Sequence, residues 1–256
     1  MGLIKSFFVA FAMYSKIPVP RVEWKKENMQ YALTFFPLIG LIIGALNLAW
    51  FSYAFDRAGE IARICVGLII PLVVTGGIHI DGYMDVMDAL HSYGDREKKL
   101  NIMKDPHVGA FAVINLLIYY LLFAAGYSQI YHFRMMGIVS AGFYLSRILS
   151  GLFAVSYKSA SGKGMLFEFT SKARLGAVRI SLVLQLIICG AIILFLDIIT
   201  GGAVLIANAI LFVYVYSLCA KEFGGINGDS CGFLSSIVEL VTVLVVGMIA
   251  LYAGTK

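Results

Sequence analysis

Seven long apolar stretches, separated by polar connections, constrain the fold of this chain more than any other feature of its sequence. A helix needs roughly 20 apolar residues to cross a hydrocarbon core of about 30 Å, and these stretches reach or approach that length. The sequence therefore predicts an all-α fold, a polytopic integral membrane helix bundle. The predicted spans are Ala32 to Phe55, Ile61 to Ile78, Val108 to Tyr127, Met135 to Val155, Ile180 to Ile199, Gly202 to Ala220 and Ser235 to Tyr252.

The composition agrees with a membrane protein. Only 14% of the 256 residues are charged and the mean hydropathy is +0.88, whereas soluble domains carry roughly 25% charged residues. Because the spans use nearly all of the apolar residues, we expect residues 1–256 to form a single membrane-embedded domain. The stretch from Leu3 to Tyr14 is apolar but too short to cross, and it predicts an N-terminal interfacial helix.

The distribution of positive charge predicts how the bundle is oriented. With the N-terminus inside, the inner connections carry fifteen of the twenty Lys and Arg residues, the outer segments carry four, and Arg147 lies within a span. Cytoplasmic loops of membrane proteins are enriched in Lys and Arg. We therefore expect a multi-pass protein of the cell (inner) membrane, with the stretches Asp81 to Asp88 and Asn227 to Asp229 both facing the cytoplasm. The two stretches are then able to share one site.

Three aspartates directly follow the second predicted span. If that segment is helical, Asp81, Asp85 and Asp88 fall on one face, at positions i, i+4 and i+7. Like charges placed this way repel one another unless a cation lies on them, and hard oxygen ligands suit Mg²⁺ or Mn²⁺. A solvated helix face is the simpler alternative. A glycine-rich turn ends in Asp229, which we expect to be exposed, and this residue is the candidate for a further carboxylate on the opposite side of the same site.

The residues after the acidic stretch predict the type of substrate. Arg96, Lys98, Lys99 and Lys104 would attract a di- or polyphosphate that carries its own Mg²⁺. Metal ions at such a site bridge phosphate oxygens and position an attacking hydroxyl for in-line displacement. We therefore expect a phosphotransferase with Mg²⁺ as cofactor.

A transporter is an alternative of a different class. Transporters place charged residues near the bilayer midplane on broken helices. Here few charged residues, among them Arg147, Asp197 and Glu239, lie within or near the spans, and no paired halves are visible. The pattern of charges therefore favours an enzyme.

Motifs spread over the whole chain match one known family. They are Ile17 to Arg21, Phe36 to Gly40, Thr75 to Leu90, Asp95-Arg96, Ile102 to Phe111, Arg147 and Gly224 to Gly232. Together they closely resemble the cobalamin synthase family, whose members are adenosylcobinamide-GDP ribazoletransferases. One departure is Asn227, where the family's motif has a threonine; asparagine keeps a polar oxygen but has no hydroxyl group.

The resemblance implies an Mg²⁺-dependent membrane transferase in the final step of coenzyme B12 assembly. Such an enzyme joins adenosylcobinamide-GDP to α-ribazole, or to its 5′-phosphate, and releases GMP. These small molecules and membrane lipid are then the expected partners, without nucleic acid, and homo-oligomerisation stays open. The expected metal ligands are Asp81, Asp85, Asp88 and Asp229; the expected catalytic residues are Asp85, Asp88, His79 and Arg147; and the expected substrate contacts are Arg96, Lys98, Lys104 and Asn227.

Three alternatives remain at the level of sequence. A CDP-alcohol phosphotransferase also uses aspartates at a membrane face, but its signature has alanine and arginine where this chain has Asp85 and Val86. His79 either bonds a backbone carbonyl near the helix start or lies near the metal or phosphate. Arg147 needs an anionic partner inside the membrane, and substrate phosphate and Glu239 are the candidates.

Overall fold

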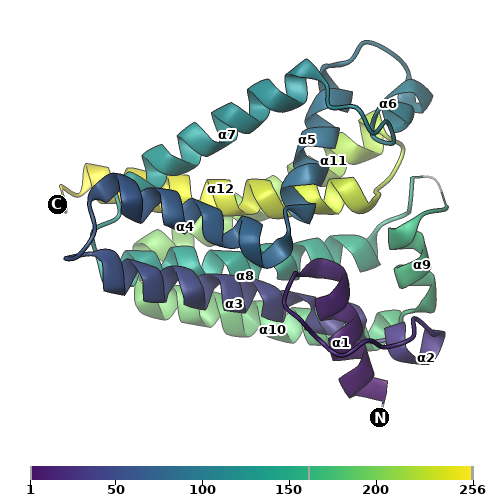
Figure 1. The fold of residues 1–256 in the computed structure, drawn as a ribbon, viewed down its shortest axis with the longest axis horizontal. Coiled ribbons are helices and arrows are strands. Elements are labelled where there is room, and N and C mark those ends of the chain that lie inside the picture. The colour runs from purple at the N-terminus through teal and green to yellow at the C-terminus, as the bar shows by residue number, and fades with distance from the viewer. Residues whose placement is uncertain (1, 161, 255–256) are drawn as a thin grey trace.

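The computed structural model describes residues 2–160 and 162–254, and this part of the chain is helical with no strand. Figure 1 shows the long helices running side by side, with α8 (Phe133–Ser156) and α12 (Gly228–Tyr252) in the interior. The other helices are α1 (Gly2–Tyr14), α2 (Lys26–Met29), α3 (Ala32–Ala54), α4 (Glu60–Thr75), α5 (Ile78–His91), α6 (Arg96–Ile102), α7 (Ala110–Ser128), α9 (Met165–Lys172), α10 (Leu175–Leu196) and α11 (Ile198–Glu222).

Six helices in the described residues are long and apolar enough to cross a membrane, namely α3, α7, α8, α10, α11 and α12. Helices α4 and α5, which bend by 96° at their junction, reach this length and hydropathy only when they are taken together as one broken span, which would be the seventh. The all-α membrane bundle predicted from the sequence is therefore confirmed. The short apolar helix α1 is also present, and it packs against α3.

The second predicted span ends earlier than expected. Gly76 and Gly77 have φ angles of 67° and 83° and so adopt a left-handed conformation that stops α4 at Thr75. The 16 residues of α4 are about 24 Å long. Beyond the two glycines α5 turns away and runs across the end of the bundle (Figure 1). The aspartates of α5 therefore lie outside the spanning segments.

Side-chain caps shift the boundaries of the last spans. The chain breaks at Asp197, whose carboxylate accepts a hydrogen bond of 2.7 Å from the Thr200 N–H, so α11 begins four residues before the predicted Gly202. Similarly, α12 begins at Gly228 and not at Ser235, because Asn227 caps it. The prediction that Asp229 is exposed at the end of a glycine-rich turn is therefore wrong, because Asp229 is half-buried in the first turn of a long helix.

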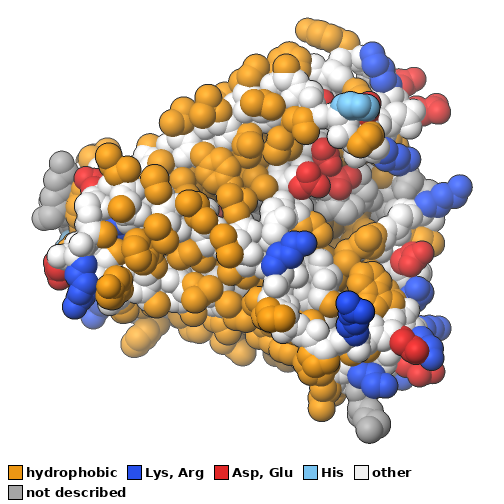
Figure 2. All heavy atoms as spheres, viewed as in Figure 1, with side chains coloured by type: hydrophobic (Ala, Val, Ile, Leu, Met, Phe, Trp, Pro, Cys, Tyr) orange, Lys and Arg blue, Asp and Glu red, His pale blue; other side chains and the backbone are white. Residues whose placement is uncertain are grey.

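The two ends of the bundle differ in charge. One end carries α2, α6, α9 and most of the Lys and Arg residues, and we call it the basic end; the opposite end carries the connections 55–59 and 129–132 (Figures 1 and 2).

Helix α8 holds the bundle together because glycines let α3 approach it closely. A Cβ atom on Gly40 or Gly44 would clash with the backbone of α8, so larger residues there would separate the two helices.

Candidate active site

Helices α5 and α12 cross in close contact at the basic end. A Cβ atom on Gly82 would lie 2.8 Å from the carbonyl oxygen of Asp229, and one on Gly232 would lie 3.0 Å from the carbonyl oxygen of His79. The Ser236 hydroxyl donates a hydrogen bond of 3.2 Å to that same His79 oxygen. These contacts bring the two acidic stretches together although they are far apart in the sequence.

The carboxylates of this site repel one another. Burial, followed by repulsion from Asp81, Asp229 and Asp88, raises the pKa of Asp85 to about 7. Asp81 is exposed, and Asp85, Asp88 and Asp229 are half-buried. Figure 2 shows acidic side chains gathered beside the apolar surface of the bundle at the basic end. A bound cation would relieve this repulsion.

Asp88 faces a different part of the surface from Asp81. Its carboxylate lies against Gly109, so closely that a Cβ atom there would overlap it, and it lines a groove with Asp105 and His107. Asp81 and Asp229 instead line a common cavity. The acidic stripe predicted along α5 thus continues from that cavity, through Asp85, to the start of α7.

Asn227 joins the cap of α12 to the acidic site. Its side-chain oxygen accepts a hydrogen bond of 2.8 Å from the Ser230 N–H, which completes a capping box with the Ser230 hydroxyl. Its amide nitrogen donates a bond of 3.1 Å to Oδ2 of Asp229. In the structure Asn227 therefore positions a carboxylate, and its contact with substrate stays a prediction.

The predicted phosphate-binding cations are distributed around the site. Arg96 donates hydrogen bonds to the carbonyl oxygens of Lys221 and Ala220, and so caps the end of α11. Lys98 donates from Nζ to the carbonyl oxygen of Tyr93, and Lys104 is exposed. These groups lie at the basic end, where they can attract a polyanion, but the bonds of Arg96 and Lys98 in this structure are to backbone.

Lys16 is a candidate that the sequence interpretation treated only as one of many inner positive charges. Its aliphatic chain covers Gly76, and its backbone N–H donates a bond of 2.8 Å to the Val74 carbonyl oxygen. Lys16 and Asp81 line the same groove at the junction of α4 and α5. The sequence carries no signal for this proximity, because it depends on the bend between those two helices.

The cavity lined by Asp81 and Asp229 has a volume of about 250 Å³. His79 is one of its wall residues; the residue is 7% exposed, and its ring stacks on Phe36 at a centroid distance of 5.6 Å. Burial, with a contribution from Arg147, holds the pKa of His79 well below its usual value, so the ring is neutral. Its Nδ1 has no hydrogen-bond partner among the described residues, so the predicted bond to a backbone carbonyl is not made there.

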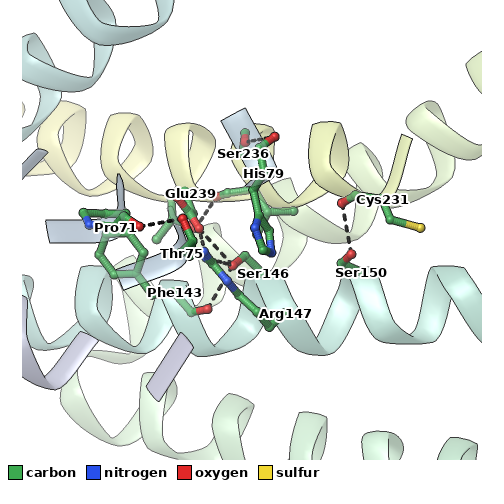
Figure 3. Close-up of polar contacts among 12 residues, drawn as sticks. Pro71, Thr75, His79, Phe143, Ser146, Arg147, Ser150, Cys231, Ser236 and Glu239 are labelled. Carbon is green, nitrogen blue, oxygen red and sulfur yellow. Dashed lines mark hydrogen bonds and ion pairs between the residues drawn. The ribbon is translucent and has the colours of Figure 1, made fainter. Parts of the chain in front are cut away.

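Arg147 lies deeper in the bundle, on α8, and is fully buried. It forms an ion pair with Glu239 of α12 and donates a hydrogen bond of 2.7 Å to the Ser146 hydroxyl. Figure 3 shows His79 directed from α5 toward this group. Of the two partners predicted for Arg147, the structure shows Glu239; a direct catalytic role for Arg147 stays a prediction.

The acidic site offers hard oxygen donors of the kind that Mg²⁺ prefers. Within residues 2–160 and 162–254, no three His, Cys, Asp or Glu side chains converge closely enough to hold an ion by themselves. Mg²⁺, however, is commonly bound through one or two carboxylates together with water and substrate phosphates. The hard oxygen donors of Asp81, Asp85 and Asp229, with the repulsion among them, fit such an open site.

Comparisons with known proteins agree over nearly the whole chain. Residues 6–247 match the family model described as cobalamin-5-phosphate synthase. An adenosylcobinamide-GDP ribazoletransferase of Lachnoclostridium phytofermentans is 37% identical, covering 96% of this chain and 94% of that protein. One of Clostridium perfringens is 34% identical, covering 96% and 98%. No solved structure matches. The resemblance recognised in the motifs is thus confirmed, in preference to the CDP-alcohol phosphotransferase alternative: the chain belongs to the cobalamin-5-phosphate synthase family.

Proposed function

We propose that this protein transfers the adenosylcobinamide-phosphate part of adenosylcobinamide-GDP to a free ribose hydroxyl of α-ribazole, or of α-ribazole 5′-phosphate, with release of GMP. The observation that carries the proposal is the match to ribazoletransferases over almost the full length of both chains. The acidic site at the basic end supports it, because carboxylates beside cations suit the transfer of a phosphoryl group.

In this reaction one bond to phosphorus replaces another. The acceptor hydroxyl oxygen forms a bond to the cobinamide-linked phosphorus, and the bond from that phosphorus to the oxygen of GMP breaks. The proton of the acceptor hydroxyl passes to a base. The carboxylates of Asp81, Asp85 and Asp229 are the candidate bases in the acidic site. Lys16, beside Asp81, is placed to contact the phosphates of the donor.

We further propose that Asp81, Asp85 and Asp229 hold Mg²⁺, with Asp88 as a more distant contributor. When bound there, the ion would neutralise charge on the phosphates and on the leaving GMP. Burial and mutual repulsion make these carboxylates unfavourable neighbours without a cation. Arg96, Lys98 and Lys104 would add a longer-range attraction for the anionic donor.

We also propose that the protein lies in the cell membrane with the basic end in the cytoplasm. The Lys and Arg residues are concentrated in the connections at that end, as the positive-inside rule requires. Both substrates are charged or polar molecules, so this orientation gives substrate dissolved in the cytoplasm direct access to the acidic site.

The test is a reaction with purified protein in detergent or nanodiscs. Adenosylcobinamide-GDP, α-ribazole and Mg²⁺ should yield GMP and adenosylcobalamin in equal amounts, and chelation of the metal by EDTA should stop both. Asp81→Asn and Asp85→Asn should lower turnover by orders of magnitude. Asp56→Asn is the matched control, because Asp56 is exposed in the connection at the opposite end. Formation of neither product by wild-type protein would refute the proposed function.

A further inference from the structure

We propose that the cavity beneath the acidic site binds the flat aromatic base of the acceptor nucleoside, with its ribose directed toward Asp81 and Asp229. The inference rests on the proposed function and adds a location for one of its two substrates. The cavity lies among α1, α3, α5, α8, α9 and α12. Its walls include the rings of Tyr14, Phe36 and His79, and flat aromatic ligands stack well on such rings.

The size and polarity of the cavity favour a benzimidazole base. Ligand pockets commonly measure roughly 300–1,000 Å³, so a cavity of about 250 Å³ admits a base and not a corrinoid ring. The wall is mainly apolar, and the hydroxyl of Ser150 already donates to the Cys231 carbonyl oxygen. Guanine would leave several donors and acceptors unpaired there, which costs the full desolvation of each group. Benzimidazole is largely apolar and avoids most of that cost.

A polar atom in the wall also lacks a partner. His79 is 7% exposed and its Nδ1 makes no hydrogen bond within the described residues. Buried polar atoms in native proteins are nearly always paired. His79 lines both this cavity and the smaller one beside Arg147 and Glu239, so a polar ligand group that reaches the ring could pair this atom. A base nitrogen or a ribose hydroxyl would supply the partner, depending on the ring tautomer.

Asp81 lies where the cavity and the groove at the junction of α4 and α5 meet. It lines this cavity together with Asp229, and it also lines the groove that contains Lys16. In-line transfer requires the attacking oxygen and the leaving group to lie on opposite sides of the phosphorus. An acceptor that enters from the cavity and a donor that binds along the groove would approach Asp81 from different sides. The large corrinoid would then remain outside the bundle.

The experiment measures binding of α-ribazole alone, by isothermal titration to purified protein without donor. Ala154→Leu fills the cavity, because Ala154 is a buried wall residue. Ala141→Leu is the matched control: it makes the same change on the same helix, about 20 Å away along α8. Met165→Trp is a second test that does not require the packed core to accept a larger side chain, because Met165 lines the cavity but is 53% exposed.

We expect Ala154→Leu and Met165→Trp to weaken α-ribazole binding, and to raise its KM, at least tenfold, with the KM of the donor unchanged. Ala141→Leu should bind as the wild type does. Unchanged α-ribazole binding in both cavity variants would overturn the inference, as would a rise in the donor KM alone. Loss of a co-purifying phospholipid from Ala154→Leu, with α-ribazole affinity intact, would show that the cavity holds an acyl chain. Because binding is measured without turnover, these outcomes are distinguishable from failure of the proposed reaction.

Discussion

Replacing Asp85 by asparagine should stabilise the metal-free protein while removing its activity. The pKa of Asp85 rises from 3.8 to about 7 in the folded protein, and a rise of roughly three units corresponds to about 4 kcal/mol against ionisation. Because the side chain is only half-buried, solvent screening reduces the usable part to ~1–2 kcal/mol. For a chain of this size that stabilisation raises the melting temperature by ~2–8 °C.

The assay is thermal unfolding in detergent, with EDTA or with Mg²⁺. The folded pKa lies above the unfolded value, so ionisation destabilises the fold progressively between about pH 4 and pH 7 and fully above it. The advantage of Asp85→Asn in EDTA should therefore be largest at pH 8 and shrink as the pH falls. Mg²⁺ should stabilise the wild type more than the variant. A variant less stable than wild type in EDTA at pH 8 would refute the argument from repulsion.

Three further predictions follow from the same geometry. Glu239→Gln should lower stability by about 3–5 kcal/mol, because it leaves Arg147 buried without its counter-ion; thermal unfolding measures this, with Asp56→Asn as control. Asp85→Asn combined with Asp229→Asn should reduce turnover little more than the worse single change, since residues of one site act together. If the fold-losses in turnover of the two single variants multiply instead, the two residues do not serve one site. Reporters fused after Lys104 and Lys221 should remain cytoplasmic and one fused after Tyr252 should be exported; opposite locations for the first two would break the shared site.

The sequence was sufficient to predict the class of fold and the position of the acidic site along the chain. Apolar segments of spanning length predict the helices, because backbone groups in lipid must be paired within the helix itself. The spacing of Asp81, Asp85 and Asp88 predicts their common helix, and α5 contains all three. Charge counting placed them at the same end as Asp229, and the contact of α5 with α12 brings the two stretches together. Their identity as metal ligands stays a prediction.

Contacts between distant segments could not be predicted in this way. The 96° bend after α4 depends on two adjacent left-handed glycines, and the apolar pattern of the segment does not reveal it. Lys16 and Asp81 line one groove at that bend, and Asp81 also lines the cavity. Capping is also difficult to read from hydropathy, since Asp197 and Asn227 each move a helix start without changing the apolar pattern. The missed features are therefore those that arise from turns and from packing.

The asparagine at position 227 has a physical explanation in the structure. The resemblance to the family led us to expect threonine there, and asparagine lacks the hydroxyl group of threonine. In this chain the two functions are divided between two atoms: Oδ1 accepts from the Ser230 N–H to cap α12, and Nδ2 donates to Asp229. A threonine hydroxyl can accept from one group and donate its single proton to another. Either residue can therefore start the helix and orient the carboxylate, whereas Asn227→Ala would lose both contacts at once.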